Sequence, residues 1–431
     1  MNAPAPHTEK AAAGVRGFLG WRVVFIAFLA QLLSNTVTLS SFGVFLEPLT
    51  ETFDKSVGEL SRAMSIVFVV MGLSGPILGQ FLDRGYARVI MPLGAAVAGG
   101  GLILMSRVEA FWLFGLLYCS VVAIGAAGFG PIPSSSLVAN WFVRKRGLAL
   151  GIAVAGATIA GAVGPELAAY WIENQGWRAA IFYFGLLALG LGVPAFAFGA
   201  IGRPELVGQL PDGEPVPDAT DGEAVTGEAI PETSELARDP RLWMLAVGFG
   251  LIFTSPIVMT LVGIPFGREL GFSAQEAARF FTAMVPFSLF GKIAFGALAD
   301  RIPPHAAIWG LVLTNLAVWA LLYLEPSYPL FVATGALYGL GIGAAMPLFG
   351  VILGRCFGRL AFGRAQGLGG LATLPLVAAA PAIAGALYDA TGTYRTAFLM
   401  QLALLFFGGV LLSFVRIPGD EPAETPAPAP A

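Results

Sequence analysis

The stretch "GQFLDRGYARV" at residues 79–89 lies between two long apolar runs, yet it contains four polar or charged side chains. Its core, Gly-x-x-x-Asp-Arg, returns in "GALADRI" at residues 296–302, again between apolar runs. Asp83 and Asp300 are 217 positions apart. A second landmark, an aromatic residue followed by Arg178 or Arg395, has the same separation. Two landmarks with one offset indicate a duplicated unit.

Composition indicates where such a unit folds. Of the 431 residues, 56% are hydrophobic and 12% are charged, and the mean hydropathy is +0.77. Soluble domains carry about 25% charged residues. The chain is therefore expected to be a membrane protein. No basic cluster points to nucleic acid as a partner. The two cysteines, Cys119 and Cys356, lie in apolar segments and provide no disulfide framework.

Runs of about 20 apolar residues predict helices that cross a bilayer, because every backbone polar group must be satisfied within the helix. Six runs precede the middle of the chain and six follow it, so the expected fold is all-α, with twelve transmembrane helices in two homologous six-helix halves. Pro131 and Pro133 are expected to kink or end the fourth helix. The predicted spans are 21–46, 59–82, 88–106, 111–140, 147–172, 177–200, 243–266, 275–298, 304–324, 328–352, 366–388 and 396–416.

The domain organisation follows from these runs. Residues 202–242 are acidic and rich in Pro and Gly, which predicts a flexible, solvated linker. An even number of spans places both termini on one side, and most of the 24 Lys and Arg residues fall on that side. The positive-inside rule therefore predicts cytoplasmic termini. The predicted segments are a tail at 1–20, a half at 21–201, the linker at 202–242, a half at 243–416 and a tail at 417–431.

Two homologous six-helix halves are typical of secondary transporters, which bind their solute at the interface of the halves. The Gly-x-x-x-Asp-Arg turns resemble the signature loop of the major facilitator superfamily. "SFGVFLEPL" (41–49), "WFVRKRGLALGIAVAG" (141–156), "GWRAAIF" (176–182) and "GALYDATGTYRTAF" (385–398) are similar to its monocarboxylate transporter and oxalate–formate antiporter branch. The resemblance runs across both halves. It implies alternating access and small organic anions as substrates.

The repeated turns suggest a gate. A carboxylate at a helix end can pair with Arg or cap a helix N-terminus in the other half, and such contacts would hold the cytoplasmic side shut. The alternative is that the turns only fix topology. Since acids contribute little to topology, we expect a gating role. The predicted gating residues are Asp83, Arg84, Arg88, Asp300 and Arg301.

Ionisable residues inside spans are functional candidates. Away from the ends of the predicted spans, Lys292 is the only basic residue and Glu166 is the only carboxylate. Lys292 lies eight residues before Asp300, about 12 Å from the cytoplasmic end, whereas Glu166 lies twenty residues beyond Arg146, about 30 Å away from that end. A direct bond between them is not expected. Alternative readings are a lysine that snorkels to the cytoplasmic surface and a glutamate wetted at the outer face.

The family resemblance implies that Lys292 holds the carboxylate of the substrate, because members of the branch carry a cation in this part of the eighth helix. The chain departs from the branch at Ser288, where animal members have an acid, and in the eleventh helix, which lacks a second cation. A single cation favours a monocarboxylate over oxalate. Glu166 is the candidate for a proton-linked acid. Polar residues predicted to line the cavity are Gln31 and Asn35 on one face of the first helix, and Thr254 and Ser255 on the seventh.

No metal-ligand spacing, phosphate loop or nucleophile–base set is present, so the sequence predicts no enzyme, no cofactor and no metal. The preferred hypothesis is a monomeric, proton-linked carrier or exchanger of a small organic anion in an inner membrane. One alternative is an exporter of apolar drugs that uses Glu166 instead of Lys292. Another is a solute sensor that has kept the carrier fold. The sequence does not name the solute, the direction of transport or the stoichiometry.

Overall fold

The computed structural model describes residues 17–214 and 231–418, and within those ranges it contains helices and no strand. Twelve segments are long and apolar enough to cross a membrane, which confirms the predicted all-helical fold. The predicted tails lie outside the described residues except for 17–20 and 417–418, and the middle of the predicted linker also lies outside them.

The first half of the chain forms six spans, and three of them are interrupted by π-helical or irregular turns. In chain order they are α1 (Gly20–Asn35), η1 (Thr36–Ser40) and α2 (Phe42–Phe53); α3 (Val57–Asp83); α4 (Ala87–Met105); α5 (Phe111–Leu116), η2 (Leu117–Val122), α6 (Ala123–Ala127) and α7 (Pro131–Trp141); α8 (Arg146–Gln175); and α9 (Trp177–Leu187), η3 (Ala188–Gly192) and α10 (Val193–Gly199).

The second half forms six spans that are each one helix. They are α12 (Pro240–Glu269), α13 (Ala274–Ala299), α14 (Pro304–Tyr323), α15 (Tyr328–Phe357), α16 (Phe362–Thr391) and α17 (Arg395–Ser413). Short helices connect the halves: η4 (Pro204–Val207), η5 (Pro211–Gly213) and α11 (Thr233–Arg238).

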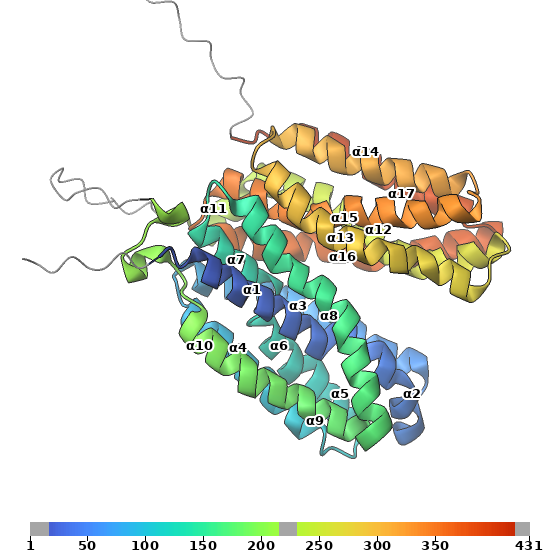
Figure 1. Ribbon diagram of the computed structural model, residues 1–431, viewed down its shortest axis with the longest axis horizontal. Coiled ribbons are helices and arrows are strands. Elements are labelled where there is room, and N and C mark those ends of the chain that lie inside the picture. Colours follow the sequence, from blue (N-terminus) through green and yellow to red (C-terminus); the bar gives the residue numbers. More distant parts are fainter. Residues whose placement is uncertain (1–16, 215–230, 419–431) are drawn as a thin grey trace, which may run out of the picture.

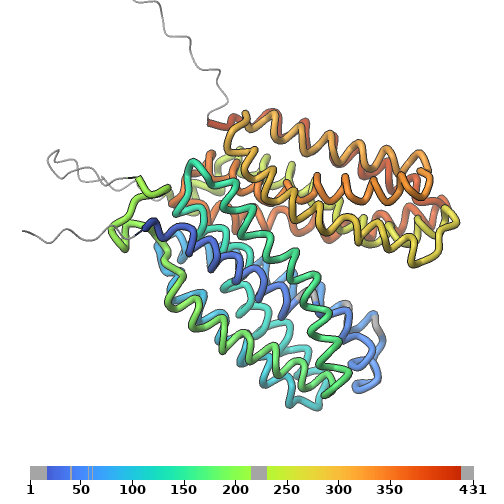
Figure 2. Tube along the Cα trace, in the orientation of Figure 1, coloured from blue at the N-terminus to red at the C-terminus, as the bar shows by residue number. Residues whose placement is uncertain are grey.

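Figures 1 and 2 show the two halves as separate bundles, blue to green and yellow to red. We call the end that carries the first and last described residues the proximal end, and the opposite end the distal end. The bundles meet toward the proximal end and diverge toward the distal end (Figure 1). The halves are joined mainly by α3 packed on α16 and by α8 packed on α13.

The duplication is visible in how the second span of each half begins. Ser56 precedes α3 and its hydroxyl accepts the Glu59 N–H at 3.2 Å, while the Glu59 carboxylate accepts the Ser56 N–H at 3.1 Å. Ser273 and Glu276 form the same capping box before α13, with bonds of 3.2 and 2.9 Å. Such a box satisfies two backbone donors that a helix start leaves free. Both boxes lie 217 positions apart, which is the offset of the Asp-Arg turns.

Prolines break the fourth span as predicted. The chain leaves α6 at Gly128, and a new helix, α7, begins at Pro131. Proline suits the first position of a helix because it has no N–H to lose. The first span differs from its prediction: it continues through the π-helix η1 to Phe53 instead of ending near residue 46.

Each half has its own buried apolar cluster. Trp141 is fully buried in the first half and Trp319 in the second. Large apolar side chains also lie on the outside of the bundles, and Trp112 and Phe198 are at least 70% exposed. A soluble protein would not expose so many, whereas a lipid bilayer solvates them. Helix association in lipid depends on close packing and not on water exclusion.

The described ends of the predicted linker contact loops of both halves at the proximal end. The Asp212 carboxylate accepts the backbone N–H groups of Val143 and Arg144 at 2.9 and 2.8 Å. Glu205 forms an ion pair of 2.5 Å with Arg359 of the second half. A short acidic segment is thereby held against basic loops at the proximal end, an attraction that composition alone did not reveal. Residues 215–230 lie outside the described residues.

Candidate functional site

Lys292 lies on α13 at its contact with α8 of the other half. A Cβ atom on Gly151 would overlap the Lys292 carbonyl oxygen, so the two backbones touch at this depth. The Lys292 Nζ donates a hydrogen bond to Thr158 Oγ1. Thr158 follows Gly151 by seven residues, about 10 Å along α8 toward the distal end. The lysine side chain therefore extends away from the proximal surface, opposite to the direction that snorkelling to that surface requires.

Glu166 does not meet Lys292. It lies eight residues beyond Thr158 on α8, about 12 Å further toward the distal end. Its side chain is exposed, and no hydrogen bond or ion pair joins it to another residue in the described ranges. The two intramembrane charges are thus separate, and Lys292 has a hydroxyl, not a carboxylate, as its partner.

Gln31 and Asn35 lie together near the end of α1. The Asn35 side-chain amide donates to the Gln31 carbonyl oxygen at 2.9 Å and approaches its Oε1 at 3.4 Å. A Cβ atom on Gly156 would overlap the backbone of Phe28 on α1. Because this contact fixes the register of α1 against α8, Gln31 lies at about the depth of Thr158. The α1 pair and the Lys292–Thr158 pair therefore occupy one layer of the membrane.

Thr254 and Ser255 are turned into the second half, and the predicted cavity-lining role does not fit this packing. The Thr254 hydroxyl contacts Gln401 Oε1 at 3.1 Å. Ser255 Oγ accepts the Trp319 indole N–H at 2.9 Å and lies 3.1 Å from the Tyr338 hydroxyl. Both residues are buried. Their polar atoms are used to join α12 to α14, α15 and α17, which is the more common role of hydroxyls between membrane helices.

The proximal contact of α3 with α16, which we call the α3–α16 seam, contains Asp83. Its carboxylate accepts the Gly363 N–H at 2.7 Å and the Arg364 N–H at 3.1 Å, both at the start of α16. The Arg364 Nε adds a bond of 2.9 Å to the same carboxylate. Asp83 is fully buried. A carboxylate at this position satisfies free N–H groups and matches the positive end of the helix dipole.

The contact of α8 with α13, the α8–α13 seam, contains Asp300. Its carboxylate accepts the Gly147 N–H at 2.7 Å and the Leu148 N–H at 3.1 Å at the start of α8. Burial raises the pKa of Asp300 above the ordinary aspartate value, while the two N–H groups and nearby arginines lower it. Each half therefore places its Asp on the first turn of a helix in the other half.

The arginines of the two turns are not part of these contacts. Arg84 and Arg301 are exposed, and their guanidinium groups form no hydrogen bond or ion pair with the residues that the structure describes. Arg88 donates to the Ala197 carbonyl oxygen at 2.9 Å, inside the first half. The structure therefore joins Asp83 and Asp300, but not the three arginines, to the contact between the halves. A guanidinium in a turn is free to remain in water, whereas the carboxylates meet unpaired backbone donors.

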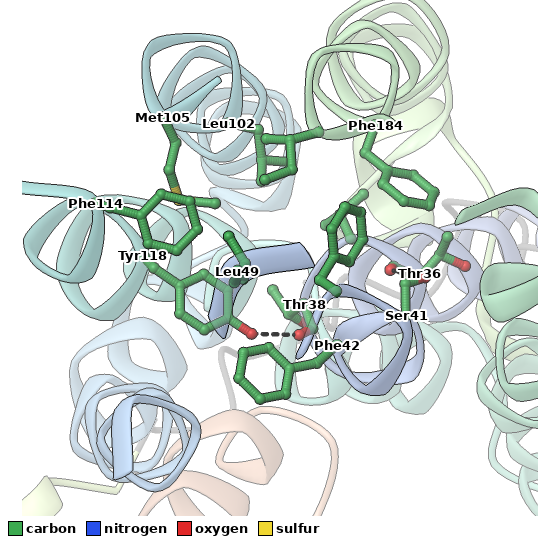
Figure 3. A pocket seen from close by; sticks show the side chains of 13 residues that line it. Thr36, Thr38, Ser41, Phe42, Leu49, Leu102, Met105, Phe114, Tyr118 and Phe184 are labelled. Atoms are coloured by element: carbon green, nitrogen blue, oxygen red, sulfur yellow. Dashed lines mark hydrogen bonds between the residues drawn. The ribbon is translucent and has the colours of Figure 1, made fainter. Parts of the chain in front are cut away.

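A cavity lies inside the first half, beside η1 (Figure 3). Its lining is mainly apolar, from Phe42 and Leu49 to Phe114 and Phe184. The Tyr118 hydroxyl points to the Thr38 carbonyl oxygen and donates to it at 2.6 Å. The cavity contains neither Lys292 nor the α1 pair. The Ser41 hydroxyl donates to the Thr36 carbonyl oxygen and the Thr38 hydroxyl to that of Ser34. The lining contains no basic side chain that could bind an anion.

Two functional features were missed in the sequence. Thr158 is the only hydroxyl residue between Gly147 and Pro165, and a single polar side chain in so apolar a run is a usable signal. The donors on Gly147 and Gly363 carry no signal of their own, because they are backbone N–H groups. Only a comparison of the starts of α8 and α16 between the two halves, made in the same way as for the Asp-Arg turns, could have indicated them.

Comparison with known proteins gives a consistent result. The family model described as Major Facilitator Superfamily matches residues 23–306 and 257–431. Monocarboxylate transporter 12 of Rattus norvegicus is 26% identical over 93% of this chain and 86% of its own length. Monocarboxylate transporter 13 of the same organism is 28% identical over 92% of this chain and 89% of its own. The predicted resemblance is confirmed.

Solved structures agree on the fold. The human organic anion transporter MFSD10 (TETRAN) superposes with a TM-score of 0.68 and 18% identity, covering 91% of this chain and 99% of that one. A bacterial homologue of the iron transporter ferroportin, in an outward-facing state, gives 0.67 and 15%, covering 91% and 98%. At these identities the likeness concerns the fold alone.

Proposed function

The chain belongs to the major facilitator superfamily, a family of transporters and not of enzymes, and we propose that it carries a small organic anion, a monocarboxylate, by alternating access. Membrane location, multiple spans and solute transport follow from the family and the twelve apolar helices. The proposal adds the class of solute, the mechanism, proton linkage and a monomeric carrier in the inner membrane.

The observation that carries the anion assignment is the environment of Lys292. Its ammonium is bonded to Thr158 across the two halves, and no carboxylate among the described residues pairs with it. Charged side chains in the interior of a membrane protein are rare and almost always pair with another group. A substrate carboxylate that reaches this layer would provide the missing negative charge, with Gln31 and Asn35 at the same depth to orient it.

Alternating access is supported by the two seams. They close the proximal end with a carboxylate on each side, whereas the bundles diverge at the distal end. We take the proximal end to be cytoplasmic, since most basic residues gather there. Opening would require Asp83 and Asp300 to release the helix starts of the opposite half, and the two halves would then move as units.

We propose Glu166 as the residue that links transport to protons. Glu166 is an exposed carboxylate toward the distal end of α8, where an acid could take up a proton from the outer solution. Its distance from Lys292 requires an indirect coupling, through the change between access states. Replacement by Gln would then uncouple anion uptake from a proton gradient without removing anion binding.

The deciding experiment is counterflow in proteoliposomes loaded with unlabelled solute, using radiolabelled monocarboxylates, a dicarboxylate and an apolar cationic drug. We expect transient accumulation of a monocarboxylate. Binding of a monocarboxylate without counterflow would favour a sensor over a carrier. Counterflow of the drug alone, insensitive to Lys292→Ala, would favour an exporter.

A further inference from the structure

A pocket at the proximal end lies between the two halves and is lined by four arginines. Arg144 precedes α8 and Arg146 begins it, while Arg355 lies in the last turn of α15 and Arg359 follows that helix. Asp300 is the one acid in its lining. The pocket is outside the layer of Lys292, and the proposed transport site does not use it.

Buried guanidinium groups distinguish this pocket from an ordinary basic loop. Arginines that only fix topology can remain in water, as Arg144 does. Arg146 is 4% exposed. Its Nε and Nη2 donate to carbonyl oxygens of Phe142 and Ala139 at 3.0 and 3.3 Å. Asp212 and Asp300 act on Arg146 electrostatically, but neither forms an ion pair with it. A buried guanidinium without an ion pair is unfavourable, so a further partner is expected.

Two of the four arginines form ion pairs with the described residues, and two do not. Glu214 pairs with Arg144 at 2.6 Å, and Glu205 pairs with Arg359. Arg355 donates to the Ala299 carbonyl oxygen at 3.2 Å and forms no ion pair within the described ranges. Asp300 is already bonded to two backbone N–H groups. Arg146 and Arg355, one from each half, therefore remain without a carboxylate of their own.

The two halves build the pocket together. A Cβ atom on Gly354 of α15 would overlap Arg146 Nη1, so the guanidinium lies directly on the backbone of the other half. Separation of the halves at the proximal end would remove Arg146 from Gly354 and divide the pocket. An anion held by both Arg146 and Arg355 would bind only while this end is closed.

From this geometry we propose that the pocket binds a phosphate group and thereby favours the closed proximal end. Guanidinium forks match phosphate oxygens in a bidentate arrangement. A phosphate monoester has a charge of about −1.5 to −2 near neutral pH, which matches two unpaired arginines. The phosphate group belongs either to a lipid headgroup or to a free phosphate compound.

The test measures binding to the purified full chain in a phosphate-free detergent. Two probes are used separately: radiolabelled inorganic phosphate, by equilibrium dialysis, and short-chain phosphatidic acid, by retention in native mass spectrometry. Saturable binding of phosphate indicates a free source, and binding of the lipid alone indicates a headgroup source. If neither probe binds, the proposal is wrong.

Variants assign the site. Arg355→Gln should weaken the affinity of the bound probe by about tenfold or more, the loss expected for one charge-assisted contact. Gly354→Ala, which displaces Arg146 without changing charge, should do the same. Arg238→Gln removes an exposed positive charge from α11 and should change the affinity less than about twofold. Equal losses in Arg355→Gln and Arg238→Gln would overturn the assignment, because only bulk charge would then matter.

The chain itself offers a competitor. The sequence after Pro418, which lines the pocket, contains Asp420, Glu421 and Glu424. A triple variant with Asn and Gln at these positions separates the cases. If the probe binds the triple variant and not the natural chain, the acids of the chain occupy the site and the phosphate proposal is overturned. Equal binding to both supports it.

Discussion

The α3–α16 seam and the α8–α13 seam use the same backbone device. In each, an Asp from one half accepts two consecutive N–H groups at the start of a helix in the other half, at 2.7 and 3.1 Å in both cases. The identical distances follow from the duplication. Closure of the proximal end is thus a symmetric property of two related halves.

The side chains of the two seams differ. The second N–H belongs to Arg364 in the α3–α16 seam and to Leu148 in the α8–α13 seam. Arg364 adds a buried ion pair to Asp83, while Asp300 has no ion pair among the described residues. Further from the proximal end, it is the α8–α13 seam that has the additional side-chain contact. Lys292 reaches Thr158 across the α8–α13 seam, whereas Gly75, 217 positions earlier, packs against the backbone of Gly367.

The fold assigns closure of the proximal end and recognition of the solute to different groups. Holding the halves together depends on backbone groups, which duplication preserves whatever the side chains are. Recognition of a solute depends on side chains, and one seam has gained a cation where the other has a glycine. The α3–α16 seam is therefore expected to be the stronger closure, and the α8–α13 seam the chemical side of the carrier.

Substitution of Lys292 should have the largest effect, because recognition of the solute is assigned to this side chain. Lys292→Ala should reduce carboxylate binding by roughly thirtyfold or more, since loss of one partner from a buried charge pair costs about 2–5 kcal/mol. Lys292→Arg should keep part of it, because the charge remains while the geometry shifts. The measurement is equilibrium binding of the transported monocarboxylate, and undiminished binding by the alanine variant would sink the assignment.

The next largest effect is on closure of the proximal end, which should differ between Asp83 and Asp300 variants. Asp83→Asn leaves Arg364 buried without its ion pair, which costs about 3–5 kcal/mol of closure. Asp300→Asn loses one acceptor for backbone N–H groups and should cost about 1–3 kcal/mol. Distances between spin labels at the proximal end report the closed fraction. Equal effects of both variants would show that the ion pair contributes nothing. Both should slow exchange of the access states more than they weaken solute affinity.

In the α8–α13 seam, substitution of Thr158 should have a smaller effect on solute affinity. Thr158→Val removes the acceptor of the Lys292 ammonium and should change the affinity for the carboxylate by about threefold to tenfold, the range of one hydrogen bond. Thr158→Ser retains the hydroxyl and serves as the matched control. If valine and serine variants behave alike in equilibrium binding, the hydroxyl does not position the lysine.

The smallest effect concerns the linker. Deletion of about ten residues within 215–230 should leave transport unchanged, because the acidic, Pro- and Gly-rich sequence predicts a linker longer than the connection needs. Asp212→Ala releases the loop before α8 and should lower the closed fraction only slightly, since exposed charge contacts contribute about 0–1 kcal/mol. A deletion that abolishes transport in protein that still inserts and folds would reveal a role for this segment.

Much of the fold could be predicted because membrane spans depend on local composition. Apolar runs located all twelve helices, and Pro131 marked the break in the fourth. The path of the linker ends could not be predicted, because it depends on which loops the acids of 205 and 212 meet in space.

The candidate site was only partly accessible from sequence. Asp83, Asp300 and Lys292 could be identified from the sequence because they are charged residues within or next to apolar spans. Their partners were not, since Gly147 and Gly363 act through backbone N–H groups. Thr254 and Ser255 looked like cavity residues until the structure showed which way the helix faces.

The glycines of the two seams have a consequence for how the halves separate. Gly147 lies against Gly296, and Gly79 lies against Gly363, so closely that a Cβ atom on either Gly147 or Gly79 would overlap the facing carbonyl oxygen. No rotamers need to rearrange when such surfaces part, so each half can leave and return as a rigid body. We expect one added methyl group, as in Gly147→Ala, to keep this end from closing and to trap the opposite access state for structural study without altering any charge.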